Sequence, residues 1–458
     1  LHSGDIDNSS GALVSAGDSQ LTSGALTNID GIVAADKGLT LVTGDANNQR
    51  GLLQAGEALS LDTQGASLNN SDSGKTGGII AGGDLLLSTG QISGSNGVIL
   101  GQNVTLDTHQ QAFDHQQGQL GARGDLQLDS GALNNRAGRI ESGGDLLLNT
   151  HGNQLINRES GTRGGLFSAG TLTLDSGAVD NQYGFMTGHR GAQVTAGGLD
   201  NRAGTLTGGT GALNLTSGEL QNQGGLLQAG SDLTLDTRGR RPNSSLFRSR
   251  IALQQPDVHG ADINNQAGVI AAGNQVTLTG GELNNIQGQV AGNGGLTFNG
   301  QAVNNNDGKL QSAGDVTIDT AGQTLSNQRG LIAGSGTTRI DSGALDNQQG
   351  QIQGGNDLTL HLGQNALQNQ HGKLFAANTM TLTAGQLINS GGQVQSVGTG
   401  TLLLTQQLDN SGGLIQGGQG LTITTPRLIN HDTRHNGTGI EAGALTVETD
   451  SLDNAQGA

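Results

Sequence analysis

The chain has 458 residues, of which 82 are glycine and only 2% are aromatic, and its formal net charge at pH 7 is -17. A hydrophobic fraction of 32% is too small for a large conventional core. The acidic balance argues against nucleic acid as a partner, because phosphates select a basic surface. The sequence has no cysteine and no apolar run near ~18 residues, so it predicts neither disulfides nor a membrane span.

A short motif, Leu-Asp/Asn-Asn with Gly three residues later, recurs about every 20 residues and separates a folded chain from a disordered one. Disordered linkers do not hold Leu, Asn and Gly in one register over hundreds of residues, whereas a period of roughly 20 to 50 residues is typical of a solenoid. The last Asn of the motif falls at Asn8, Asn28, Asn48, Asn70, Asn135, Asn157, Asn181, Asn201, Asn222, Asn265, Asn285, Asn305, Asn327, Asn347, Asn369, Asn389, Asn410, Asn430 and Asn454.

Each repeat is predicted to form three short strands. Within residues 339–361, apolar and polar residues alternate at 345–347, 351–353 and 358–360, and glycine-containing corners separate these segments. Counting Gly94 and His115, which occupy the Asn register, gives 20–21 coils of 20–22 residues. If the coils stack as parallel strands at about 4.8 Å each, they make a shaft on the order of 100 Å long.

The recurring Asn is predicted to form a structural ladder from Asn28 to Asn430, in which each side-chain amide hydrogen-bonds to the next coil. Asn also tolerates the left-handed backbone that a corner demands. The following Gly is expected where a Cβ has no room or φ is positive. About five apolar side chains per coil cannot stabilise a coil alone, so neighbouring coils must supply the remainder.

Three segments lengthen the turn just after the Asn: residues 71–78, 158–165 and 431–439. They share one phase of the repeat and are therefore predicted to emerge from one edge of the β-helix. Insertions in one phase often mark a binding face. Tolerated surface loops are the simpler alternative, because loops lengthen at little entropic cost.

The largest break delays the next Asn from Asn222 to Asn265. The sequence therefore divides into a β-helix shaft over 1–237, a basic, proline-containing insertion over 238–262, and a continued shaft over 263–458. One interpretation is an excursion that contacts an acidic glycan or a protein. The others are a solvated or disordered loop and one degenerate extra coil. The candidate contact residues are Arg240, Arg241, Phe247, Arg248 and Arg250.

Aspartate recurs at two positions of the repeat. One set is Asp18, Asp84, Asp125, Asp145, Asp232, Asp315 and Asp357, and the other is Asp62, Asp107, Asp129, Asp175, Asp236, Asp319 and Asp341. A catalytic carboxylate appears once, whereas a corner residue appears in every coil. The pattern therefore predicts structural carboxylates, no catalytic residues and no enzyme, although β-helices that degrade polysaccharides place two or three carboxylates together.

The remaining candidate side chains predict no site. His431 and His435 with Asp432 have a plausible metal-ligand spacing but no third ordered ligand, so we expect no metal and no cofactor. His109 and His115 flank Phe113 at a corner and are predicted to face solvent. Tyr183, Phe185 and Met186 are interpreted as core or edge fillers.

The consensus Leu-x-Asn-x-x-Gly-x-Ile-x-Ala-Gly-Gly-x-Leu-x-Leu, present with variations at residues 133–148 and 263–278, resembles the filamentous haemagglutinin repeat. The resemblance covers the chain apart from 238–262. It implies a right-handed parallel β-helix, the shaft of two-partner-secretion exoproteins of Gram-negative bacteria. These proteins include adhesins and carriers of contact-dependent growth-inhibition toxins, and a dedicated outer-membrane barrel exports them.

From this resemblance we expect a non-catalytic, monomeric shaft of a secreted or outer-membrane-associated exoprotein that projects a receptor-binding or toxin region toward a target cell. The implied partners are the outer-membrane transporter and a target-cell receptor or glycan. Neither the Asn-Pro motifs of the family's secretion domain nor its Val-Glu-Asn-Asn junction occurs, so we expect an interior section. Two alternatives remain: the shaft itself is an adhesin acting through its insertion loops, or it is a polysaccharide-degrading enzyme.

Overall fold

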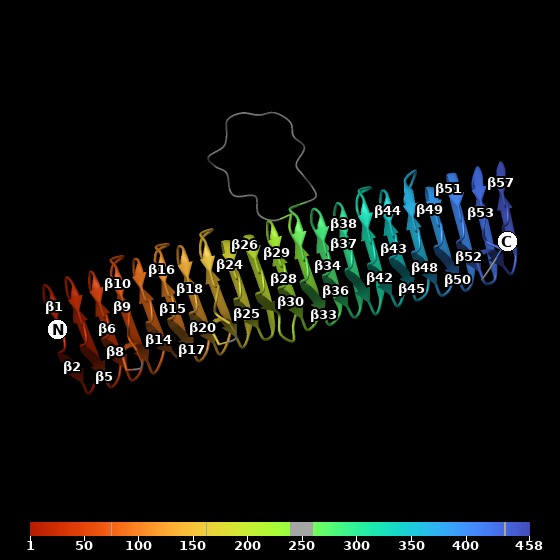
Figure 1. Ribbon diagram of the computed structural model, residues 1–458. Coiled ribbons are helices and arrows are strands. Elements are labelled where there is room, and N and C mark those ends of the chain that lie inside the picture. Colours follow the sequence, from red (N-terminus) through yellow and green to blue (C-terminus); the bar gives the residue numbers. More distant parts are fainter. Residues whose placement is uncertain (75, 162, 239–259, 435–436) are drawn as a thin grey trace, which may run out of the picture. The chain divides into compact units, whose positions relative to one another are not determined.

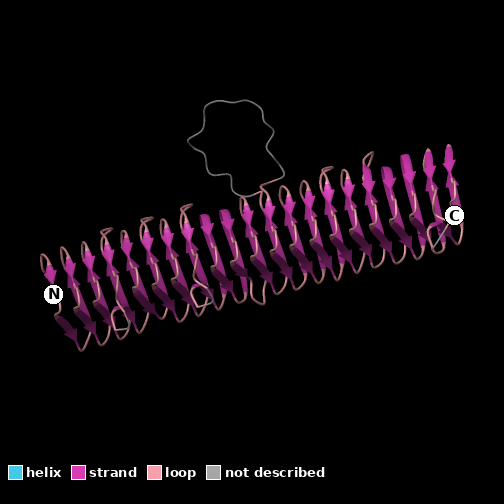
Figure 2. Ribbon diagram, viewed as in Figure 1, coloured by secondary structure: helices cyan, strands magenta, loops and turns pink. Residues whose placement is uncertain are grey.

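The computed structural model describes residues 1–74, 76–161, 163–238, 260–434 and 437–458. These residues form strands and turns without a helix and make about 21 turns of parallel β-solenoid, which confirms the predicted fold class (Figures 1 and 2). No described helix therefore has the length and apolarity of a membrane span. The chain divides into two compact units, residues 1–220 and 221–458 apart from the undescribed residues, and both are built from the same coil.

One coil of the first unit shows how the strands are arranged. It contains β4 (Leu26–Thr27), β5 (Ile32–Ala35) and β6 (Leu39–Val42). Each pairs in parallel with its equivalent one coil later, β7 (Ala46–Asn47), β8 (Leu52–Ala55) and β9 (Leu59–Asp62). Strands equivalent to β5 form what we call the first sheet, and those equivalent to β4 and β6 form the second sheet.

The strands of the first sheet are all equivalent to β5. In the first unit it also contains β2 (Ala12–Ser15), β11 (Gly78–Ala81), β14 (Val98–Gly101), β17 (Gln119–Ala122), β20 (Arg139–Ser142), β23 (Gly165–Ser168), β25 (Phe185–Gly188) and β27 (Thr205–Thr207). In the second unit it contains β30 (Leu226–Ala229), β33 (Val269–Ala272), β36 (Gln289–Gly292), β39 (Lys309–Ser312), β42 (Leu331–Gly334), β45 (Gln351–Gly354), β48 (Lys373–Ala376), β50 (Gln393–Ser396), β52 (Leu414–Gly417) and β55 (Gly439–Ala442).

The core is a set of aligned apolar columns that run through the coils of each unit. In the coil that contains β4, β5 and β6, the inward side chains are Leu26, Val33, Ala35, Leu39 and Leu41, and none is more than 4% exposed. Alternation along each strand sends the intervening residues outward. These five side chains match the number expected per coil, and their neighbours in the core belong largely to adjacent coils.

The recurring Asn side chains lie inside the coils and form hydrogen bonds from one coil to the next. Asn28 Nδ2 donates to Asn48 Oδ1 at 2.7 Å and to the backbone oxygen of Leu52 at 3.2 Å. Equivalent amide-to-amide bonds of 2.7–2.9 Å join Asn8 through Asn70 and Asn135 through Asn201 in the first unit, and Asn222 through Asn454 in the second. Because a buried amide is costly without partners, each coil satisfies its neighbour.

The turn after each Asn does not use Asn as its left-handed residue. The left-handed residue is the second after Asn, as at Asp30 (φ 53°) and Gln287 (φ 55°), so the assignment of that backbone to Asn was wrong. The Gly one residue further on, such as Gly31, has an ordinary φ, and its amide donates to Asn28 O at 3.2 Å. A Cβ on Gly31 would collide with Asn8 O and Asn28 Oδ1, so lack of room explains the glycine.

Two glycines of the first unit test this constraint. A Cβ on Gly204 would collide with Asn181 O, whereas a Cβ on Gly198 would have Glu219 O as its nearest neighbour at an ordinary 3.6 Å. Gly204→Ala should therefore lower the free energy of unfolding by about 1–3 kcal/mol, the usual cost of overpacking. Gly198→Ala should change it far less. Urea denaturation of both variants measures the difference, and equal effects would contradict the steric account.

Candidate functional site

The repeated carboxylates lie at the corners of the coils and cap backbone amides. In the first set, Asp315 Oδ1 accepts from Thr337 N at 2.7 Å in the next coil, and Asp357 Oδ1 accepts from Thr379 N at 3.0 Å. The hydrogen bonds from the Thr379 side chain and backbone hold the pKa of Asp357 below its ordinary value. In the second set, Asp62 Oδ1 accepts from Gln64 N at 2.7 Å. These carboxylates position corners, as their repetition predicted.

A second buried polar column, which was not predicted from the sequence, follows the second set of aspartates. Thr63 Oγ1 donates to Ala66 O, and Thr320 Oγ1 donates to Gln323 O, both at 2.6 Å. Each of these four-residue turns adds two residues to a coil, which explains coils of 22 rather than 20. The recurring Asp-Thr or Asp-Ser pair was the signal in the sequence.

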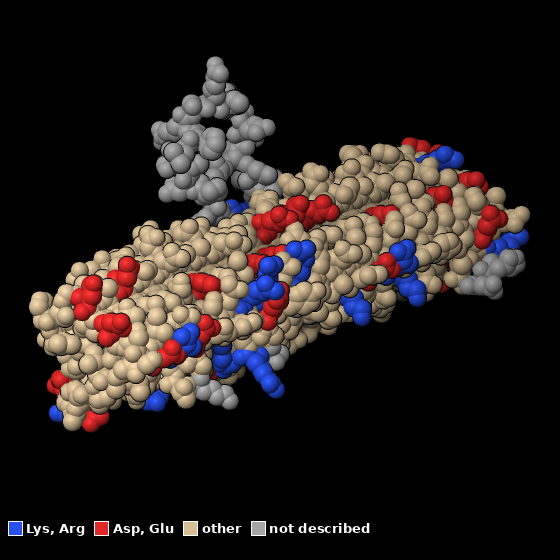
Figure 3. All heavy atoms as spheres, turned by 60° about the vertical axis from the view of Figure 1, so that its left-hand side comes forward, with Lys and Arg blue, Asp and Glu red and all other residues tan. Residues whose placement is uncertain are grey.

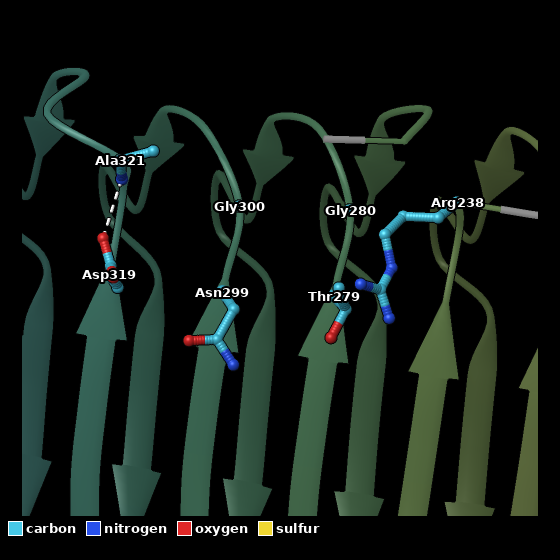
Figure 4. A pocket seen from close by; sticks show the side chains of 7 residues that line it. All are labelled: Arg238, Thr279, Gly280, Asn299, Gly300, Asp319 and Ala321. Carbon is cyan, nitrogen blue, oxygen red and sulfur yellow. Dashed lines mark hydrogen bonds between the residues drawn. The ribbon is translucent and has the colours of Figure 1, made fainter. Parts of the chain in front are cut away.

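A shallow polar groove of about 180 Å³ lies along this corner in the second unit (Figure 4). Thr279, Asn299 and Asp319 stand at the same position of successive coils, and Gly280 and Gly300 follow the first two where the chain leaves the strand. The turn containing Ala321 and the side chain of Arg238 are the other lining groups. Asp319 Oδ1 accepts from Ala321 N at 2.8 Å, and Arg238 pairs with Asp236 at 2.8 Å.

The lining of this groove bears on the enzyme hypothesis. Of the seven described residues that line it, Asp319 alone is a carboxylate, whereas most glycosidases need a pair of them. One Asp319 oxygen already holds a turn. The groove therefore offers polar groups for binding, but not the pair of carboxylates expected of glycoside hydrolysis.

His115 interrupts the Asn column of the first unit and is buried, with 1% of its surface exposed. The prediction that it faces solvent was wrong, because it stands in the Asn register and points inward. Its Nε2 lies 3.3 Å from Arg139 O, while its Nδ1 and Asn135 Oδ1 have no partner among the described residues. Phe113 fills the space beside Gly94, the preceding member of the column. His109, in contrast, is exposed.

Burial lowers the pKa of His115 from 6.5 to about 4, against a smaller opposite effect of the Arg139 hydrogen bond. Between these two values the unfolded chain binds the proton more readily than the folded chain. The free energy of unfolding should therefore fall as the pH falls from 6.5 toward 4, by about 3 kcal/mol in all.

His115→Asn should remove this contribution and give Asn135 Oδ1 a donor, whereas His109→Asn should preserve the pH dependence. Chemical denaturation across the pH range measures all three proteins. Parallel profiles for wild type and His115→Asn would contradict the assignment.

The three insertions begin in the same way at the corner that precedes the first sheet. Ser73, Ser160 and Thr433 replace the turn glycine, and their hydroxyls donate to the oxygens of Asn70, Asn157 and Asn430 at 3.1, 3.3 and 3.2 Å. Each insertion ends at a glycine with a left-handed φ of 105–117°, which begins the next strand: Gly78, Gly165 and Gly439. They thus share one phase of the coil, as predicted.

The break in the sequence repeat leaves the second sheet at a different corner. Asn222 Nδ2 donates directly to Asn265 Oδ1 at 2.8 Å, and Leu226 pairs with Val269 in the first sheet. The two coils are therefore neighbours, which contradicts the hypothesis of an extra coil between them. Thr237 Oγ1 donates to Ala261 O at 2.6 Å where the chain returns. The candidate contact residues Arg240, Arg241, Phe247, Arg248 and Arg250 lie outside the described residues.

The other candidate residues do not come together in one site among the described residues. Met186 is buried in the core, as expected for a filler, whereas Tyr183 is 65% exposed. His431 Nδ1 pairs with Asp432 Oδ2 at 2.8 Å, His435 lies outside the described residues, and the described part of the chain has no cluster of three metal-ligating side chains. On the face shown in Figure 3, acidic and basic side chains are interspersed.

Comparison with known protein families gives a match. The family model of the haemagglutinin repeat matches residues 3–89, 66–114, 80–159, 150–212, 187–240, 250–319, 311–366, 363–412 and 427–458. These overlapping matches include nearly the whole chain. No curated protein and no solved structure matches.

Proposed function

Because the chain belongs to the haemagglutinin-repeat family, we propose that it is a non-catalytic shaft that holds a distal receptor-binding or toxin region away from a bacterial surface. The main support is that the recurring polar side chains form hydrogen bonds that hold the fold together. Each Asn amide and the recurring Asp carboxylates join one coil to the next or shape a corner. Polar groups that are used up in stacking and in corners suit a spacer better than a catalyst.

Family membership implies a secreted or cell-surface protein. We propose further that the parent protein is the exported component of a two-partner system and crosses the outer membrane through a dedicated barrel. The absence of cysteine suits such a route, since no disulfide has to form. Each coil that folds outside the cell gives the next coil apolar cover and amide partners, and this stacking helps to draw the chain outward.

Removal of whole coils tests the spacer function. Deletion of 266–305 joins Asn265 to Asn306-Asp307-Gly308, which restores the Asn turn and removes two 20-residue coils. The shaft should shorten by about 10 Å and remain folded. In the whole exoprotein, the action of the distal region on target cells should decline with the number of coils removed, whichever coils they are. Loss of activity on removal of one particular pair, but not of another, would contradict a spacer.

The alternative that the shaft itself is an adhesin is favoured by the insertions that share one corner and by the basic segment 238–262. Deletion of 240–258 provides the test. The stem of this segment is already closed by the Thr237–Ala261 hydrogen bonds, so the melting temperature should be unchanged. Attachment of the purified chain to target cells should persist if it is a spacer. Loss of attachment at unchanged stability would favour the adhesin.

A further inference from the structure

Aromatic residues are scarce in this chain, yet two of them stack on one surface of the first unit and a third lies in the turn that leads to it. The sequence contains six Phe, one Tyr and no Trp. Phe113 and Phe298 are fully buried, as expected of core residues. Phe167 and Phe185, however, point outward from β23 and β25 and are only partly buried, and Tyr183, in the turn before β25, is 65% exposed.

Phe167 and Phe185 form a continuous layer with Arg139. The Phe167 and Phe185 rings stack with centroids 5.1 Å apart and an interplanar angle of 27°. The Arg139 guanidinium lies 4.3 Å from the Phe167 centroid. Since β23 pairs with β20 on one side and with β25 on the other, Arg139 and Phe185 approach Phe167 from opposite sides. We call Arg139, Phe167, Tyr183 and Phe185 the aromatic patch.

The patch joins an insertion loop on one side. Arg139 Nη1 donates to Arg163 O at 2.8 Å, which ties the 158–165 insertion to the patch. Arg139 also pairs with Glu141 at 2.8 Å.

On the other side lies a hollow of about 440 Å³ that is lined by Ile80, Leu100, Gln119, Gly121, Arg123 and Glu141, among others. Gly121, Glu141 and Phe167 occupy one register position in successive coils, so the hollow lies where a side chain is missing from that outward column. Arg123 at the hollow and Arg163 in the insertion loop are exposed and form no ion pair with any described residue.

The coil itself does not require these aromatic residues. Thr187 and Thr205 stand in the columns of Phe167 and Phe185 one coil later. Ala203 occupies the same left-handed turn position one coil after Tyr183, with φ 51° against 52°. A bulky residue such as Tyr is unfavourable at this position. In the second unit, the outward column that corresponds to Phe167 holds mainly Gln and Ala, with Phe375 as its aromatic member.

We infer that the aromatic patch and its hollow dock a protein partner, which inserts an apolar side chain into the hollow and places carboxylates against Arg123 and Arg163. Tyr and Arg are the residues enriched where protein interfaces carry most of their binding energy. The two uncommitted arginines favour an acidic partner surface. A sugar ring is a poorer fit, because Arg139 and Phe185 cover Phe167 from both sides. This inference goes beyond the function of a shaft.

Two matched libraries of short displayed peptides test the inference. Both carry a random apolar position, flanked by Asp and Glu in one library and by Lys and Arg in the other. The acidic library should be enriched on the whole chain. The double variant Phe167→Thr/Phe185→Thr should bind the enriched peptides with an affinity that is lower by about tenfold at least. Phe375→Thr, at the equivalent position of the second unit, is the control and should bind them normally.

A second variant reverses a charge without removing the packed Phe167 and Phe185 rings. Arg163→Glu lies in an exposed loop and should weaken binding of the acidic peptides while the melting temperature stays unchanged. Failure of the acidic library to enrich, or equal binding by wild type and the double variant, would overturn the inference. Two other results would replace the partner: saccharide binding that the double variant loses, or self-association in sedimentation that the double variant loses.

Discussion

The structure depends on the contact between the Asn of one coil and the glycine of the next. The Asn28 backbone oxygen stands where a Cβ on Gly51 would be, and the Asn28 amide donates to Asn48 Oδ1 at 2.7 Å. The hydrogen bond between the Asn side chains forms because the backbones of adjacent coils approach closely, and this approach is possible because the turn residue is glycine. Within its own coil the Asn28 amide reaches the Gly31 oxygen at 3.2 Å, but the Asn28 amide oxygen accepts from Asn8 of the preceding coil. The coils are therefore stable only as a stack, as in other repeat proteins.

This dependence leaves the outer surface free to vary. Inward positions hold mainly Leu, Ile, Val, Asn and small residues. Corners accept two extra residues at Thr63–Ala66, a longer loop at 158–165 or the additional residues between Arg238 and Gly260 without disturbing the register. The departures from the repeat are accordingly the features for which we propose a function. The insertions, the basic segment and the aromatic patch are proposed for recognition, and the repeat supplies length.

The sequence predicted the period, the three strands per coil and the parallel β-helix. The alternation of apolar and polar residues within a strand and the recurrence of Asn about every 20 residues can both be read directly from the sequence. It misplaced His115, since the column that admits Asn also buries whatever replaces it. It also assigned the left-handed turn position to Asn instead of the residue two positions later. The aromatic patch was not recognised, because Arg139, Phe167 and Phe185 are adjacent only when coils stack. The spacing of Phe167 and Phe185 is close to one coil length, but the 158–165 insertion lengthens the spacing of Arg139 and Phe167.

The central claim is that the Asn side chains of each unit are hydrogen-bonded from coil to coil inside the protein. Hydrogen exchange of the side-chain amides in a chain labelled with nitrogen-15 at Asn measures this directly. The interior column members, such as Asn305, should exchange orders of magnitude more slowly than exposed Asn residues such as Asn299. Exchange of the column amides at the rate of exposed Asn would contradict the account.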